Sequence, residues 1–241
     1  MAQGSPRCHH TDRQGFVVDA VDFGNTALPN SYYDGRCMAN ATRNKILRNG
    51  LALASQAGLE GVTLGVLANQ VGMSKSGLFA HFHSKEDVQI HVLDESLKLG
   101  AVHIVEPAMT KPEGLPRLTA LVENWLGWAP RSGLPGGCPV AAGLFEYDDI
   151  EGPVHEKVKE MEANWRGFLA MHVQRAMELG DLRHDLDVEQ FVWELCGIYL
   201  SHHVASRFVR APDADRRANT AFSELLNRAA PTRARSQRRR R

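Results

Sequence analysis

The stretch from Thr63 to Lys85, TLGVLANQVGMSKSGLFAHFHSK, constrains the fold more than any other part of the chain. It predicts two short helices joined by a glycine turn and followed at once by the start of a third. The hydroxyl of Thr63 can accept a backbone N–H that has no partner in a first helical turn, and Gly72 supplies the positive φ that ends a helix. Ser74 can cap the second helix in the same way.

The second of these helices has an inner and an outer side. Leu78 and Phe82 are four residues apart, so they share one face and are predicted to pack inward. The remaining side chains point elsewhere, and they are Lys75, Ser76, Phe79 and His81. An exposed phenylalanine between a lysine and a histidine makes a poor solvent surface, and it indicates a contact surface.

Helical patterns continue on both sides of this stretch, and no strand pattern competes with them. An amphipathic helix over residues 42–57 precedes it. Residues 84–87, Ser-Lys-Glu-Asp, have the form of a capping box and open a longer helix through about Val105, ended by Pro107. Further helices are expected at 112–129, in a short segment through 147, at 153–180, from 187 to about 208, and from about 213 to 230. We therefore predict an all-α protein with about nine helices and no internal repeat.

The charge of the chain is unevenly distributed. The formal net charge of the 241 residues is zero, but residues 41–90 hold five cations and three acids, and residues 91–227 hold 13 cations and 21 acids. Residues 228–241 carry seven arginines and no acid. A mildly basic head on an acidic body lets a polyanion approach the head, as in a nucleic-acid binder.

Composition excludes several classes of protein. No run of about eighteen apolar residues occurs, so no membrane span is expected. The N-terminus lacks the apolar run of a signal peptide. Four widely spaced cysteines without a CxxC pair predict a reduced, cytoplasmic protein rather than a disulfide scaffold.

Four regions follow from these patterns. Residues 1–40 have no sustained period and are predicted to form a flexible arm, unless translation begins at Met38. Residues 41–90 form the helix-turn-helix domain, residues 91–230 a helical body, and residues 231–241 a disordered arginine-rich tail that either contacts DNA or only adds solubility. The arm contains a group of metal-ligand side chains without a second ligand pair, so no metal is predicted there: Cys8, His9, His10 and Asp12.

Residues 42–90 resemble the TetR family of bacterial transcription regulators. The resemblance is carried by Gly61–Thr63 at the start of the second helix and by the turn Val71–Ser74. The string Lys75–Phe82, followed by Ser84–Glu86, completes it. This combination is more specific than a generic helix-turn-helix pattern.

The resemblance implies that the second helix of the pair enters the major groove of double-stranded DNA. Carried over residue by residue, it implies DNA contacts from Thr63, Ser74, Lys75, Ser76, Gly77, Phe79, His81 and Lys85. Thr63 and Lys85 would each contact a phosphate. A cation at the helix N-terminus, where Lys85 lies, is mildly unfavourable unless an anion arrives. The family often has tyrosine where this chain has Phe79, so one hydroxyl contact is absent.

The body resembles the family only in general plan. That plan implies a pocket for a small-molecule effector and a homodimer interface formed mainly by the last two helices. Candidate pocket residues are Trp125, Trp128, Cys138, Phe145, Trp165, Phe168, His172, Trp193 and Tyr199. For each aromatic residue, packing in the core is the alternative role, and for Cys138 the alternative to redox sensing is an inert buried thiol.

Together these features predict a ligand-responsive DNA-binding regulator without a cofactor, more specifically a repressor. As a homodimer it would bind a palindromic operator and be released by a small molecule. The alternative is a helical small-molecule-binding or enzymatic protein that does not use DNA. No G-x-S-x-G, H-E-x-x-H or P-loop pattern is present, so we predict that the protein is not an enzyme.

Overall fold

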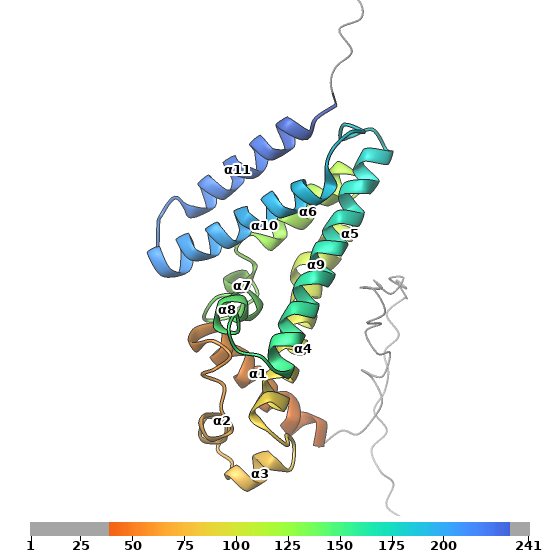
Figure 1. Ribbon diagram of the computed structural model, residues 1–241. Helices are drawn as coiled ribbons and strands as arrows, with labels where there is room; N and C mark the ends of the chain where they lie inside the picture. Colours follow the sequence, from red (N-terminus) through yellow and green to blue (C-terminus); the bar gives the residue numbers. More distant parts are fainter. Residues whose placement is uncertain (1–38, 232–241) are drawn as a thin grey trace, which may run out of the picture. The chain divides into compact units, whose positions relative to one another are not determined.

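The computed structural model describes residues 39–231, which contain eleven α-helices, two π-helical segments and no strand (Figure 1). The prediction of an all-α fold is confirmed. No helix in this described range is long and apolar enough to cross a membrane. Residues 1–38 of the predicted N-terminal arm, with its metal-ligand candidates, and residues 232–241 of the arginine tail lie outside the described residues.

The first four helices follow the sequence signals closely. They are α1 (Ala39–Ala57), α2 (Leu64–Val71), α3 (Lys75–Phe79) and α4 (Lys85–Gly100). The Thr63 hydroxyl accepts the Val66 N–H at 3.2 Å, and the Ser74 hydroxyl accepts the Gly77 N–H at 3.0 Å. Gly72 ends α2 with a φ of 73°. We call the segment from α1 to the first turn of α4 the head.

The head has a core of its own, built from the inward side chains of all four helices. Leu78 and Phe82 are fully buried, as predicted. They share the core with Leu67 of α2 and Val88 of α4, and the Arg43 guanidinium lies 4.7 Å from the centre of the Phe82 ring. α1 also packs along α4. This core fixes which side of α3 remains outside.

α4 runs on into the body through a π-helical segment, η2 (Ala101–Val105), and then into α5 (Glu106–Met109). The prediction that the helix ends at Pro107 is therefore wrong. The proline lies in the first turn of α5, where a residue without an N–H is tolerated. The wider π turn precedes it.

The predicted helix over 112–129 is two helices, α6 (Leu115–Trp125) and α7 (Trp128–Arg131). Leu126 is extended and Gly127 has a φ of 67°, so the chain turns between them. α5 and α7 together raise the predicted nine helices to eleven. A loop rich in glycine and proline then leads to α8 (Pro139–Glu146), as the sequence predicts.

The remaining body consists of α9 (Pro153–Glu178), α10 (Val188–Val204), the π-helical segment η3 (Ala205–Val209) and α11 (Ala214–Ala229). α9 begins with a proline and ends before a glycine of positive φ, Gly180. The Asp187 carboxylate accepts the Gln190 N–H at 3.0 Å and caps α10. α10 and α11 pack against each other side by side (Figure 1).

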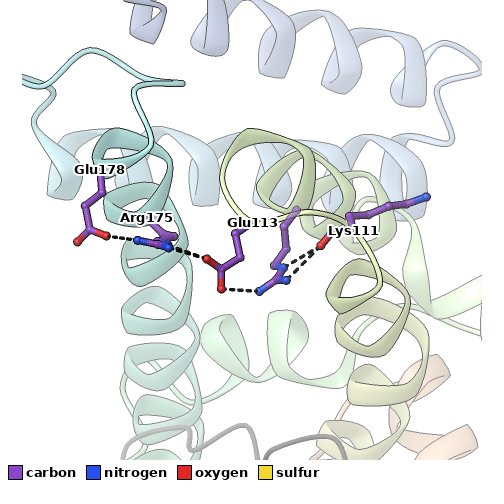
Figure 2. Close-up of polar contacts among 5 residues, drawn as sticks. Lys111, Glu113, Arg175 and Glu178 are labelled. Atoms are coloured by element: carbon purple, nitrogen blue, oxygen red, sulfur yellow. Dashed lines mark hydrogen bonds and ion pairs between the residues drawn. The ribbon is translucent and has the colours of Figure 1, made fainter. Parts of the chain in front are cut away.

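An ion-pair cluster fastens the segment between α5 and α6 to the C-terminal part of α9 (Figure 2). Arg175 on α9 donates to Glu113 at 2.8 Å and to Glu178 at 2.8 Å. Arg117 donates two hydrogen bonds to the Lys111 carbonyl, at 3.1 and 3.2 Å, and lies 3.7 Å from the Glu113 carboxylate.

Candidate nucleic-acid interface and effector site

The outer side of α3 presents the side chains that the sequence predicts. Lys75, Ser76 and Phe79 are exposed, and 48% of the Phe79 surface is accessible. Gly77 and His81 are partly exposed. The Ser74 hydroxyl lies 3.1 Å from that of Ser76, so two hydroxyl groups stand together at the N-terminus of the helix. One hydroxyl donates its hydrogen to the other, and the hydrogen of the second remains available to a phosphate or a base edge.

Lys75 is the cation of this surface. No ion pair joins it to a carboxylate within residues 39–231. Its side chain passes over the first turn of α2, where a Cβ on Gly65 would lie only 3.1 Å from the Lys75 Cε. The glycine therefore leaves room for the lysine stem, and the ammonium group stays near the N-terminus of α2.

Lys85 has a partner that the sequence did not reveal. Its Nζ lies 2.7 Å from a carboxylate oxygen of Glu60, so an internal anion already compensates the cation at the start of α4. The other Glu60 oxygen accepts the Tyr147 hydroxyl at 2.6 Å. The Lys85 and Tyr147 hydrogen bonds lower the pKa of Glu60. Because Glu60 and Tyr147 are 87 residues apart, no local pattern could have paired them.

α1 brings further cations that sequence reasoning did not assign. Lys45 donates to the Val71 carbonyl at 3.2 Å and so caps the end of α2. Arg48 is exposed. The only signal that could have selected Arg48 is its position on the polar face of an amphipathic helix, which most surface cations share.

Five of the predicted pocket residues form one continuous row of rings. Tyr199 stacks on Trp125 at 3.9 Å between centroids, and Trp125 meets Trp165 at 5.2 Å. Phe168 lies 5.6 Å from Trp165, and His172 lies 4.6 Å from Phe168. We call these five residues the aromatic row. It runs from α10 across α6 to α9.

Some polar atoms of the aromatic row have a hydrogen-bond partner and others have none in the described residues. The Trp128 indole donates to the Tyr199 hydroxyl at 3.2 Å. By contrast, Trp165 Nε1 and His172 Nε2 are buried without a hydrogen-bond partner in the described part of the chain. Burial, reinforced by the Arg117 charge, lowers the pKa of His172 from 6.5 to about 4. A neutral imidazole and an indole N–H are thus left available inside the body.

The other pocket candidates lie apart from the aromatic row or at its edge. Phe145 and Trp193 are exposed, at 57% and 64%. Cys138 is buried, caps α8 and accepts the Ala141 N–H at 3.5 Å, which matches an inert thiol. A cavity of about 380 Å³ lies between α6 and α11, and none of the predicted pocket residues lines it. No group of three or more metal-ligand side chains occurs in the described residues.

Comparison with known proteins identifies the family to which this head and body belong. Residues 46–91 match the family model described as bacterial regulatory proteins, tetR family. Residues 114–222 match the model of the tetracyclin repressor-like C-terminal domain, and the two models together match more than half of the chain. The chain belongs to the TetR family. It is therefore a DNA-binding transcriptional regulator with a helical ligand-binding C-terminal domain.

Individual relatives are more distant. The chain is 29% identical over 169 residues to the nucleoid occlusion factor SlmA of Cronobacter sakazakii, covering 68% of this chain and 82% of that protein. A TetR transcriptional regulator of Chloroflexus aurantiacus superposes with a TM-score of 0.66 at 21% identity, covering 78% of this chain and 93% of that one. AibR, solved with isovaleryl coenzyme A and operator DNA, gives a TM-score of 0.59 at 19% identity, covering 76% and 96%. The two structures share the TetR fold with this chain.

Proposed function

We propose that this TetR-family regulator is a cytoplasmic repressor that binds a palindromic operator as a homodimer and leaves it when a small molecule enters the body. The observation that carries the proposal is the outer side of α3. It presents Lys75, Ser76 and Phe79 to solvent, while Leu78 and Phe82 anchor the same helix in the head. A helix held by its inner face and polar at its exposed N-terminus suits insertion into a major groove.

We assign the DNA contacts to the eight predicted residues. Lys75 and Ser76 approach base edges and the backbone from the N-terminus of α3, and Ser74 and Gly77 frame the same end. Phe79 meets a thymine methyl or the groove wall, as apolar side chains do. The other three assigned contacts are to the backbone, from Thr63, His81 and Lys85. Because few of these groups can distinguish bases, much of the affinity comes from phosphates and falls with salt.

The homodimer is supported by an exposed apolar stripe along α10 and η3. Trp193, Val204 and Phe208 are 64%, 42% and 87% exposed, and they recur at helical spacing on one side. Gly197 lies between them with open space at its Cβ position. A stripe of this kind needs cover, and a second copy related by a two-fold axis supplies the same stripe.

The dimer has its own test. Phe208→Glu places a charge within the stripe and should convert a dimer into a monomer in sedimentation equilibrium at micromolar concentration. Lys159→Glu, an exposed charge change on α9 away from this stripe, serves as the charge control. If the wild type sediments as a monomer at every concentration, the homodimer is excluded.

The effector is assigned to the aromatic row. Its unpartnered indole and imidazole nitrogens are buried polar groups that a ligand could satisfy. AibR, a structural neighbour, was solved with an acyl-coenzyme A. This suggests acyl thioesters as the first compounds to screen by thermal shift, with a bound compound raising the unfolding temperature.

A gel shift on the DNA upstream of its own gene tests the function. Lys75→Ala and Phe79→Ala should weaken binding, whereas Lys159→Ala, which removes an exposed lysine of α9, should leave it unchanged. If the wild type binds no DNA specifically under any ligand condition, the regulator proposal is wrong. If Lys75→Ala binds as tightly as wild type, the residue assignment fails and the function can still stand.

Mapping the bound sites in cells tests the repressor role. One relative, SlmA, is named a nucleoid occlusion factor, and this name does not refer to the repression of a gene. A local repressor should occupy a few sites next to promoters, and deletion of the gene should raise transcription there. Many sites scattered away from promoters would contradict the repressor proposal.

A further inference from the structure

The turn between α1 and α2 is held by side chains from two helices outside it. Gln89 of α4 donates to the Leu59 carbonyl at 2.6 Å from a buried position. Glu146, the last residue of α8, accepts the Glu60 N–H at 3.1 Å. The same Glu146 carboxylate lies so close to Gly58 that a Cβ there would be 1.6 Å from its oxygen. The backbone of the turn is therefore fixed by both α4 and α8.

The side chain of Glu60 is held as firmly as its backbone. One carboxylate oxygen accepts the Tyr147 hydroxyl at 2.6 Å, and the other lies 2.7 Å from Lys85 Nζ. The Tyr147 side chain is buried next to the end of α8. The carboxylate thus lies between a residue of the body and the first residue of α4.

The pair between Glu60 and Lys85 is exposed enough to exchange. The side chains are 49% and 33% accessible. Ion pairs at such positions contribute little to stability, because water and salt screen them. A phosphate can therefore replace the carboxylate as the partner of Lys85, but only if the negative charge of Glu60 moves away or is tolerated beside it.

We propose that Glu60 is an internal competitor of DNA phosphate for Lys85, and that the end of α8 sets this competition by holding the Glu60 carboxylate in place. The inference rests on the proposed function, in which Lys85 contacts a phosphate. A shift of α8 that draws Tyr147 away releases the Glu60 carboxylate from its place beside Lys85. The affinity of the head for DNA then rises.

α8 is suited to pass a change in the body to this pair. At its N-terminal side, the Gly137 N–H donates to the Ser55 carbonyl of α1 at 2.7 Å. Its capping residue, Cys138, lies close enough to the Tyr199 hydroxyl of the aromatic row to help burial raise the pKa of that tyrosine. α8 thus touches the aromatic row at one end and the head at both ends.

The test measures the salt dependence of DNA binding by the full chain. Fluorescence anisotropy between 50 and 200 mM salt uses the duplex that the wild type shifts in a gel. Glu60→Gln should steepen the log–log slope by about 0.9 per head, so that affinity falls by about 3.5-fold more per head over this range. Glu86→Gln is the matched control, because it removes a neighbouring charge that forms no ion pair with Lys85 in the described structure.

The decisive comparison repeats both substitutions with Lys85→Gln. Competition predicts that the gain in DNA affinity from Glu60→Gln falls to less than half when Lys85 is replaced. Any gain in DNA affinity from Glu86→Gln should persist in that background. Tyr147→Phe should act in the same direction as Glu60→Gln, more weakly, and should add nothing to it. Circular dichroism of each variant verifies that the helices are intact.

Each failure has a separate meaning. If the gain from Glu60→Gln is the same with and without Lys85, the carboxylate acts only as a general charge and this inference is wrong, although the function stands. If Lys85→Gln changes no slope in either background, the assigned phosphate contact is wrong, and the competition is wrong with it. If the wild type binds no DNA, the proposed function itself fails.

Discussion

The buried imidazole of His172 should make the stability of the body depend on pH. The residue is 6% exposed, packs edge-on against Phe168, and its Nε2 has no hydrogen-bond partner among the described residues. Burial and the nearby Arg117 cation lower its pKa from 6.5 to about 4, and the weaker effect of Glu113 opposes them. The folded protein therefore keeps this ring neutral far below neutral pH.

The sign follows from where the proton binds. As the pH falls through 6.5, the unfolded chain takes up a proton at His172 and the folded chain does not. The contribution to stability is therefore fully present above pH 6.5 and is lost as the pH falls toward 4. For these two pKa values the free energy of unfolding should drop by about 2 kcal/mol between pH 7 and pH 5.

Urea denaturation followed by circular dichroism at pH 7, 6 and 5 measures this loss. His172→Phe and His172→Gln both remove the titrating group, one with an apolar ring and one with a polar amide. Both should flatten the pH dependence by about 2 kcal/mol relative to wild type. Burial also lowers the pKa of His203, so the prediction concerns the difference between variant and wild type. If either variant loses stability as steeply as wild type, His172 is not the group responsible.

Three further tests concern the fold and the head. Phe82→Ala should cost about 3–5 kcal/mol in chemical denaturation because the ring is fully buried, whereas Phe79→Ala should change stability by less than about 1 kcal/mol and weaken DNA binding; equal costs would contradict the assigned faces of α3. Gly136→Ala should destabilise by about 1–3 kcal/mol, since its Cβ would lie 1.8 Å from the Ser55 carbonyl oxygen, and an unchanged denaturation midpoint would show that this contact is loose. Thr63→Ala should cost about 1 kcal/mol through the lost cap of α2, and a Thr63→Ser variant should retain most of that stability.

The head could be predicted from sequence because its signals are local. A capping hydroxyl three residues before the N–H that it accepts, and a glycine at the one position that needs positive φ, act within a single turn of chain. Thr63, Gly72 and Ser74 each work in this way, and all three predictions are confirmed. Phe79 was predicted to be exposed by the same reasoning, because its position relative to Leu78 fixes its side of the helix.

The body was harder to predict because its decisive features depend on packing between distant segments. Pro107 ends a helix by local rules, yet a π-helical segment before it lets the chain continue. Gly127 breaks a helix that its apolar pattern extends across. Residue type alone selected Phe145 and Trp193 as pocket residues, and both are exposed, since burial is decided by which helix lies opposite.

Packing between distant segments also decides which cations of the head have a carboxylate partner, and the sequence alone does not show this. Three carboxylates belong to the segment 41–90, and none of them lies on α2 or α3. Asp87 accepts the His83 N–H at 2.8 Å, and Glu60 pairs with Lys85. Interactions with its own N–H and with Ser84 lower the pKa of Glu86. All three acids therefore have partners in or next to the first turn of α4, while Lys75 on α3 has no carboxylate partner in the described residues. A phosphate approaching α3 meets a cation without internal competition, whereas one approaching α4 must first displace Glu60. We therefore propose that the backbone contact at α4, and not the groove contact at α3, is the point at which the body regulates binding.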